Sequence, residues 1–150
     1  MKKLITIIAL VVFTFGFSQS DRKKMHEKIK SEKIAFITER LSLTTDEAAK
    51  FWPIYNKHEA ARRDIKTKYF RPIKQKMRDN SDVAEADAEK MLGNLILGEN
   101  KMHESKIGLV QDLKGVIPAM KIIKLKSVED AFNKKLLERL KKFRKASERK

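Results

Sequence analysis

The sequence predicts an all-α protein, and three observations support this prediction. Gly and Pro are scarce, with 5 and 3 residues in a chain of 150. Apolar residues recur at steps of three and four along most of the chain, and no segment alternates as a half-buried strand would. Charged residues make up 37% of the chain, which is typical of long helices with solvated faces.

Residues 1–20 have the pattern of a secretory signal peptide. Two lysines precede an apolar run over residues 4–17, which is short for a bilayer span, and small or polar residues follow it. Cleavage after Ser18 or after Ser20 fits this pattern, and an uncleaved anchor is the alternative. Without Cys the chain is not a lipoprotein. We expect a periplasmic protein with one helical domain over residues 21–150 and no transmembrane segment in the mature chain.

The mature chain is strongly basic. The whole sequence carries a net charge of +15, and only two of its lysines lie in the predicted signal peptide, which leaves +13. Charge alone would favour nucleic acid as the partner, but secretion argues against it. Acidic polypeptides and anionic lipid or lipopolysaccharide head groups are the partners that a basic periplasmic protein meets.

The best helix-start signal in the sequence is a capping box at Thr44 and Glu47. The Thr44 side chain can accept a hydrogen bond from the Glu47 backbone N–H, and the Glu47 carboxylate can accept one from the Thr44 N–H. The surrounding stretch also contains Leu43, Phe51, Trp52, Pro53 and Tyr55. We expect its aromatic residues to anchor a neighbouring helix or a partner subunit.

Apolar periodicity predicts four helices, over residues 21–42, 45–78 and 83–117 and from Pro118 onward. The third helix would take its N-cap from Ser81 or Asp82. Pro53 and Pro72 should kink the second helix without ending it. Gly93, Gly98, Gly108 and Gly115, all assigned to the third, can let a neighbouring helix approach closely.

The helix lengths predict an elongated architecture. The second and third helices would each be roughly 50 Å long at about 1.5 Å per residue, whereas a compact domain of this size has a radius of gyration of only about 14 Å. We therefore expect an elongated antiparallel hairpin of long helices with two flanking helices. One such layer leaves apolar surface uncovered, which predicts a homodimer or an open concave face.

The motifs give little support to catalysis and only weak support to metal binding. The sequence contains no nucleophile elbow, no His-Glu-x-x-His and no phosphate-binding loop, so we expect neither an enzyme nor a cofactor. Met-His-Glu occurs at residues 25–27 and 102–104. Soft and imidazole ligands suit copper, nickel or zinc, and His58 and His103 would be the metal ligands if the two predicted helices bring them together.

The second helix carries a set of cations and aromatic residues that predicts a partner-binding surface. Long Lys and Arg side chains beside aromatic rings can hold unfolded acidic or apolar segments without a defined pocket. A solvated face with no client is the alternative. We call these residues the cationic–aromatic set: Arg62, Arg63, Lys66, Tyr69, Phe70, Arg71 and Lys74.

The motif Leu-Thr-x-x-Glu at residues 43–47 resembles the Leu-Thr-x-x-Gln motif of the Spy/CpxP-like periplasmic proteins. The continuation Phe-Trp-Pro-Ile-Tyr over residues 51–55 is similar to a Bacteroidetes branch described as sensors of extracytoplasmic-function sigma factors, as is the segment over residues 129–137. The chain departs from the family at Glu47, where the motif has Gln, and at residues 117–121, which lack the expected second motif.

This resemblance implies a cradle-shaped helical dimer that senses envelope stress. It would hold unfolded polypeptides without ATP, or bind a membrane regulator of the anti-sigma type. Heavy-metal-sensing relatives make a periplasmic metal sensor the alternative. A tentacle chaperone of the Skp type would need a trimerising β-core, and the sequence has no pattern for one.

Overall fold

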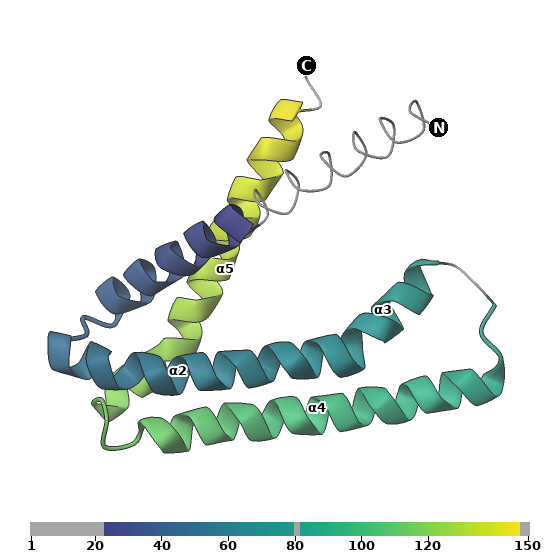
Figure 1. Cartoon of the computed structure of the whole chain (residues 1–150), viewed down its shortest axis with the longest axis horizontal. Helices are drawn as coiled ribbons and strands as arrows, with labels where there is room; N and C mark the ends of the chain where they lie inside the picture. The colour runs from purple at the N-terminus through teal and green to yellow at the C-terminus, as the bar shows by residue number, and fades with distance from the viewer. Residues whose placement is uncertain (1–22, 80–81, 148–150) are drawn as a thin grey trace, which may run out of the picture. The chain divides into compact units, whose positions relative to one another are not determined.

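The computed structural model describes residues 23–79 and 82–147. Over these ranges the chain is helical apart from short connections, without any strand, and an isolated bridge joins Lys114 to Ile117 (Figure 1). The all-α prediction is therefore confirmed for this part of the chain. None of its helices is both long enough and apolar enough to cross a bilayer. The predicted signal peptide, residues 1–20, lies outside the described residues.

The chain divides into two compact units, and we describe each by itself. Unit 1 comprises the described residues up to Ser42 and from Leu125 onward, and unit 2 comprises those from Leu43 to Lys124. The prediction of a single domain stays a prediction. The elements in chain order are a helix over residues 23–40, α2 (Thr45–Ile65), the π-helix η1 (Lys66–Phe70), α3 (Arg71–Arg78), α4 (Glu85–Leu113) and α5 (Ala119–Ser147).

The predicted capping box opens α2. The Glu47 N–H lies 3.2 Å from Thr44 Oγ1, and the Thr44 N–H lies 2.8 Å from Glu47 Oε2. Both hydrogen bonds satisfy donors that the first turn of a helix leaves without a partner. The sequence therefore predicted both the start of this helix and its local geometry.

The second helical run has the predicted outer bounds, Thr45 to Arg78, but it is not one regular helix. The α2 helix continues past Pro53. Before Pro72 the chain forms η1, in which the Arg71 N–H donates to the carbonyl of Lys66, five residues earlier. Proline has no N–H to donate, and its ring crowds the carbonyl four residues back in a regular α-helix. A π-helical turn here shifts the backbone hydrogen bonds to a spacing of five residues, so the helix continues past the proline.

The prediction for the third helix was wrong at both ends. Its N-cap is Ala84 rather than Asp82, without a side-chain capping bond, and Ser81 lies outside the described residues. Glu85 and Asp87 in the first turn favour the positive end of the helix dipole instead. The helix ends at Leu113, four residues earlier than predicted. Gly115 then adopts a φ of +76°, a left-handed conformation that suits glycine and turns the chain towards Pro118.

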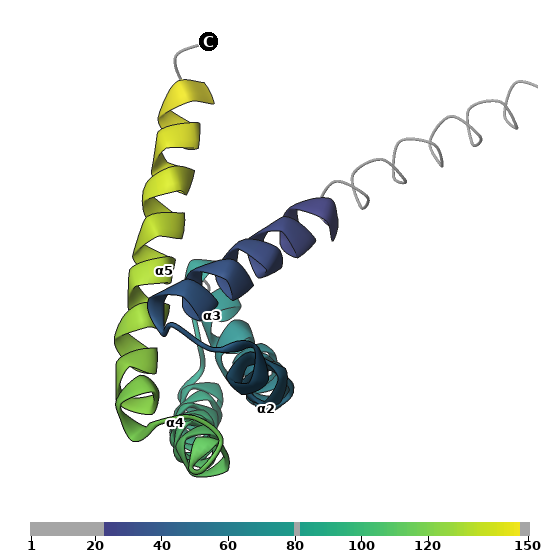
Figure 2. The ribbon, with the colours of Figure 1, turned by 90° about the vertical axis from the view of Figure 1, so that its left-hand side faces the viewer.

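The α2 and α4 helices lie side by side in unit 2, as Figure 2 shows almost end-on. A Cβ atom added at Gly98 would lie 2.8 Å from Tyr69 Cβ, and one added at Gly108 would lie 3.1 Å from His58 Cε1. Two of the four glycines therefore sit where a neighbouring element comes close. A Cβ atom added at Gly93 would meet nothing within 4 Å, and Gly115 lies in the turn rather than in a helix.

The aromatic cluster of α2 is part of the packed interior. Phe51 and Tyr55 are 0% and 1% exposed, and their rings stack with centroids 5.3 Å apart. Trp52 is half-buried and meets both rings edge-on, at 5.0 Å and 5.4 Å. Burial of these rings removes a large apolar area from water, so packing in the interior accounts for the aromatic residues of this stretch.

Candidate functional site

The structure divides the cationic–aromatic set into packed and exposed members. Tyr69 is buried, Phe70 is half-buried, and both lie against Gly98 of α4. The Arg62 guanidinium lies 3.5 Å from the Glu59 carboxylate and 5.7 Å from the centre of the Tyr55 ring. The exposed members of the set are Arg63, Lys66, Arg71 and Lys74. The predicted mixture of cations and open aromatic rings is thus not one continuous surface.

A groove of about 290 Å³ lies nearby in unit 2, between the η1–α3 segment and the first half of α4. We call it the lysine groove. Tyr69, Ile73 and Met91 are buried or half-buried and form its apolar base, whereas its lysines are exposed. The lining residues are Lys68, Tyr69, Pro72, Ile73, Lys76, Asp87, Lys90, Met91 and Asn94.

The charges around the lysine groove are mainly positive. Lys68 Nζ lies 5.4 Å from the centre of the Tyr69 ring, within the range of a cation–π contact. Lys90 lies 3.7 Å from Asp87, and both side chains are well exposed, so water screens this pair. An apolar base beside three lysines suits a short extended segment that carries both apolar and acidic side chains.

Sequence reasoning identified only part of this groove. Tyr69 belongs to the cationic–aromatic set, and Lys68 and Lys76 lie on the same predicted helix. Asp87, Lys90 and Met91 were missed because they come from α4. The periodicity of one helix predicts its apolar face, but it does not predict which residues of a second helix lie opposite. Gly98 was the sequence signal that could have indicated this alignment. A glycine within a helix allows a neighbouring element to approach closely, and that contact determines which residues of α4 face η1.

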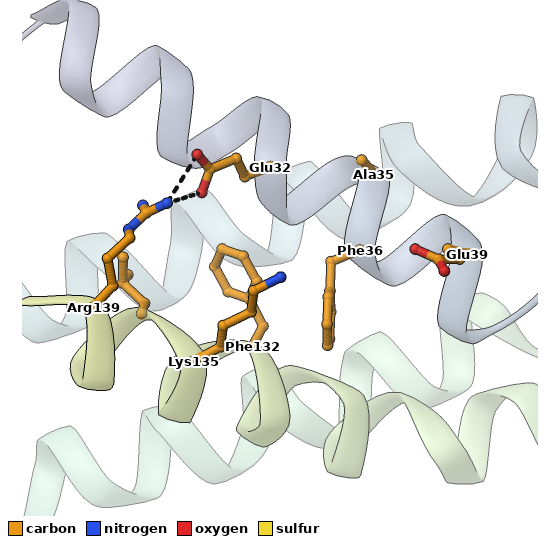
Figure 3. Close-up of a pocket in the computed structure, with 8 residues that line it drawn as sticks. Glu32, Ala35, Phe36, Glu39, Phe132, Lys135 and Arg139 are labelled. Atoms are coloured by element: carbon orange, nitrogen blue, oxygen red, sulfur yellow. Dashed lines mark hydrogen bonds and ion pairs between the residues drawn. The ribbon is translucent and has the colours of Figure 1, made fainter.

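Unit 1 contains a second concave site, between the helix over residues 23–40 and α5 (Figure 3). Its volume is about 340 Å³. Phe36 and Phe132 both line it, and their rings pack against each other at a tilt of 52° with centres 5.7 Å apart. Arg139 closes one end through contacts of 3.0 Å and 2.8 Å to the two carboxylate oxygens of Glu32. Lys135 Nζ lies 5.5 Å from the centre of the Phe36 ring.

The charges of this second site largely compensate one another. Glu32 already holds Arg139, while Glu39 adds a further carboxylate to the lining. The site therefore lacks the excess of positive charge that distinguishes the lysine groove. We take the lysine groove as the candidate functional site because its chemistry complements the acidic partners that the basic composition predicts.

His58 has a structural partner rather than a second histidine. Its Nε2 lies 2.8 Å from the Asp112 carboxylate, and its ring packs on Gly108. The hydrogen bond from His58, assisted by the charge of Lys57, lowers the pKa of Asp112 below its ordinary value of 3.8. His103 is exposed and, five residues before Gly108, lies about 140° away around the helix. Over the described ranges, no three His, Cys, Asp or Glu side chains are grouped as metal ligands.

Comparison of the chain with protein-family models found no match, and neither did comparison with curated proteins or with solved structures. The resemblance to the Spy/CpxP-like proteins stays a prediction from the motifs.

Proposed function

We propose that this protein is a periplasmic, chaperone-like sensor of envelope stress that binds unfolded polypeptides in the lysine groove. A membrane regulator linked to an extracytoplasmic-function sigma factor would be bound through the same chemistry. The observation that carries the proposal is the groove itself, whose apolar base lies beside Lys68, Lys76 and Lys90. Unfolded segments present apolar and acidic side chains together. An open groove can bind such a segment without the shape complementarity that a folded partner needs.

We further propose that the protein acts as an elongated hairpin of long helices with two flanking helices, assembled into a cradle-shaped homodimer. The opposite directions of α2 and α4 support the hairpin, because Tyr69 meets Gly98 while the earlier His58 meets the later Gly108. Binding without catalysis or a cofactor is the activity that we assign to it. No observation in the described residues favours the metal-sensor alternative.

A test of polypeptide binding uses charge reversal with a matched control. We expect residues 21–150 to suppress aggregation of chemically reduced α-lactalbumin, an acidic client, at substoichiometric to equimolar ratio without ATP. The groove variant Lys68→Glu/Lys76→Glu/Lys90→Glu should lose most of this suppression, because the reversed charges repel the client. Circular dichroism should show an unchanged helix content, since all three side chains are exposed.

The control reverses three exposed cations outside the groove, Arg63→Glu/Lys66→Glu/Lys74→Glu. It has the same change in net charge, so it should retain most of the suppression. An equal loss in both variants would mean that only net charge matters and would contradict the groove. Absence of suppression by the unaltered protein would contradict the chaperone activity itself.

Sensing is tested in cells. Deletion of the gene should change the transcript levels of a regulon controlled by an extracytoplasmic-function sigma factor when envelope proteins are made to misfold. A gene for such a sigma factor beside this one would support the link. Unchanged transcripts under misfolding stress would contradict the sensing part of the proposal.

A further inference from the structure

The positive charge of the mature chain is concentrated at one end of unit 1. In this unit Phe36 packs against Phe132, while the earlier Glu32 contacts the later Arg139, so the helix over residues 23–40 and α5 run in opposite directions. The start of the first of these helices and the end of the second therefore lie at the same end of the unit (Figure 1). We call residues 23–31 and 140–146 the cationic tip.

The cationic tip is dense in lysine, and all of its charged side chains are exposed. Residues 23–31 contain four lysines and one glutamate, and residues 140–146 contain three lysines, one arginine and no acid. These two short segments carry a net charge of +7, more than half of the +13 of the mature chain. The much longer unit 2 has 16 Lys or Arg and 12 Asp or Glu, a net charge of only +4. An anionic partner is therefore attracted most strongly to the tip.

Exposed apolar side chains accompany these cations on α5. Leu137, Leu140 and Phe143 are 58%, 50% and 65% exposed. At about 100° per residue, the three positions lie within an arc of about 120° around the helix. Met25, which is 56% exposed, adds an apolar side chain from the other helix of the tip. The tip thus combines a high positive charge with apolar area that is open to solvent.

The lysines of the α5 end lie outside this apolar arc. Lys141, Lys142 and Lys145 are each about 100° or more around the helix from Leu140, which is at the centre of the arc. Arg144 lies within the arc, where the methylene groups of its side chain can cover apolar surface while the guanidinium points outward. A lysine-rich polar face opposite Leu and Phe is the pattern of a helix that lies in the interface of a membrane.

Two observations favour a lipid surface over an acidic protein as the anionic partner. Seven of the eight cations of the tip are lysines. Lysine is a flexible point charge that suits mobile phosphate head groups, whereas fixed carboxylates on a folded protein favour the planar fork of arginine. The tip is also formed by two helix ends at one end of unit 1, so a planar surface can reach both of them at once.

We propose that the cationic tip binds the surface of membranes that contain anionic phospholipids. The lysines attract the phosphate head groups, and Leu137, Leu140 and Phe143 enter the boundary between head groups and acyl chains. This inference goes beyond the proposed function, because it assigns a second surface with a different partner. The lysine groove belongs to unit 2, so the two surfaces share no residue.

The first test measures flotation of residues 21–150 with lipid vesicles. This chain lacks the apolar run over residues 4–17, which could insert by itself. We expect binding to vesicles of phosphatidylglycerol and phosphatidylcholine in equal parts, little binding to pure phosphatidylcholine, and weaker binding as NaCl is added. The tip variant Lys141→Gln/Lys142→Gln/Lys145→Gln should lower the partition coefficient at least about tenfold, because each lysine near an anionic surface adds to the attraction.

The matched control is Arg63→Gln/Lys66→Gln/Lys74→Gln, which removes three exposed cations of unit 2. Its partition coefficient should stay within about twofold of that of the unaltered protein. An equal loss in both variants, equal binding to both kinds of vesicle, or no binding by the unaltered protein would each overturn the inference.

The second test asks whether the apolar arc enters the membrane. Because the sequence has no cysteine, Phe143→Cys or Glu104→Cys can carry a single environment-sensitive nitrobenzoxadiazole dye. With anionic vesicles, the emission of the dye at position 143 should shift to the blue and be quenched by nitroxide-labelled lipid. The dye at position 104, an exposed site on α4, should change little. An unchanged dye at position 143 would contradict the proposed insertion.

An acidic polypeptide as the partner of the tip predicts a different result. If the tip variant loses the suppression of α-lactalbumin aggregation while the unaltered protein does not float with vesicles, the tip binds polypeptides and the membrane inference is refuted. If flotation depends on the tip but the protein does not suppress aggregation, the inference stands and the chaperone activity falls.

Discussion

The carboxylate of Glu47 serves two partners at the start of α2. It accepts a hydrogen bond from the Thr44 backbone N–H, and it lies 2.6 Å from Lys121 Nζ. The ammonium group of Lys121, and then the Thr44 N–H, hold the pKa of Glu47 below its ordinary value of 4.5. The sequence predicted the first partner from local spacing, but Lys121 is 74 positions away and carries no local signal.

This arrangement predicts how stability depends on pH. A carboxyl group whose pKa is lowered by folding contributes stability above its unfolded pKa and loses it as the pH falls through the folded value. Glu47→Gln should therefore unfold at a lower urea concentration than the unaltered protein at pH 7. The difference should shrink as the pH falls below 4.5 and then through the lowered pKa of the folded state, because the Glu47 carboxyl group becomes neutral there, as the Gln side chain already is. Urea titrations across this range, followed by circular dichroism, measure it.

A control for this prediction is Glu104→Gln, which changes an exposed glutamate of α4. Its midpoint should differ little from that of the unaltered protein at pH 7. If the Glu47→Gln difference stays constant down to pH 3, the contacts with Lys121 and Thr44 are not the source of the effect.

At the scale of the elements, Gly98 decides how closely α4 approaches η1. A Cβ atom there would come within 2.8 Å of Tyr69 Cβ and 3.0 Å of Phe70 Cζ. The ring of Phe70 can shift, but the Cβ of Tyr69 is attached directly to the backbone, so the two segments would have to separate. The approach in turn creates the base of the lysine groove, because it places Met91 beside Ile73 in the lining.

Two glycine substitutions in the same helix should therefore have opposite effects. Gly98→Ala should lower the free energy of unfolding by about 1–3 kcal/mol through overpacking. Gly93→Ala meets nothing within 4 Å and should raise it by up to about 1 kcal/mol, because alanine favours the helix. Urea unfolding of both variants measures the contrast, and a similar rise in both would show that α4 and η1 are not in close contact at Gly98.

The sequence predicted the elements better than their relations. The helix starts at Thr44 and Pro118 rest on local chemistry, so spacing alone was enough to find them. The end of α4 was missed because apolar residues continue through Ile117, while the left-handed turn at Gly115 has already ended the helix. The lysine groove was not predicted: of the predicted binding residues only Tyr69 lines it, and Lys90 of α4 joins Lys68 and Lys76 only through packing between helices.

At the scale of the whole molecule, the proposed function depends on export. The basic composition would indicate nucleic acid for a protein that stays in the cytoplasm, so the predicted signal peptide changes which partners are relevant.

Export gives a direct prediction. The mature protein from a periplasmic extract should begin at Gln19 or at Asp21, because the small residues Ser18 and Ser20 precede these positions. Intact-mass measurement distinguishes the two. A chain that keeps residues 1–20 and fractionates with the membrane would support the uncleaved anchor instead.

The π-helical turn before Pro72 also bears on comparisons of this chain with others. A π-turn has the geometry of one residue inserted into an α-helix, and the apolar positions Ile65, Tyr69, Ile73 and Met77 accordingly follow at three successive steps of four. A relative that keeps a regular helix would match this chain only with a one-residue gap within residues 66–70. An ungapped alignment of the two sequences would then place every residue after the π-turn one position away from its structural equivalent.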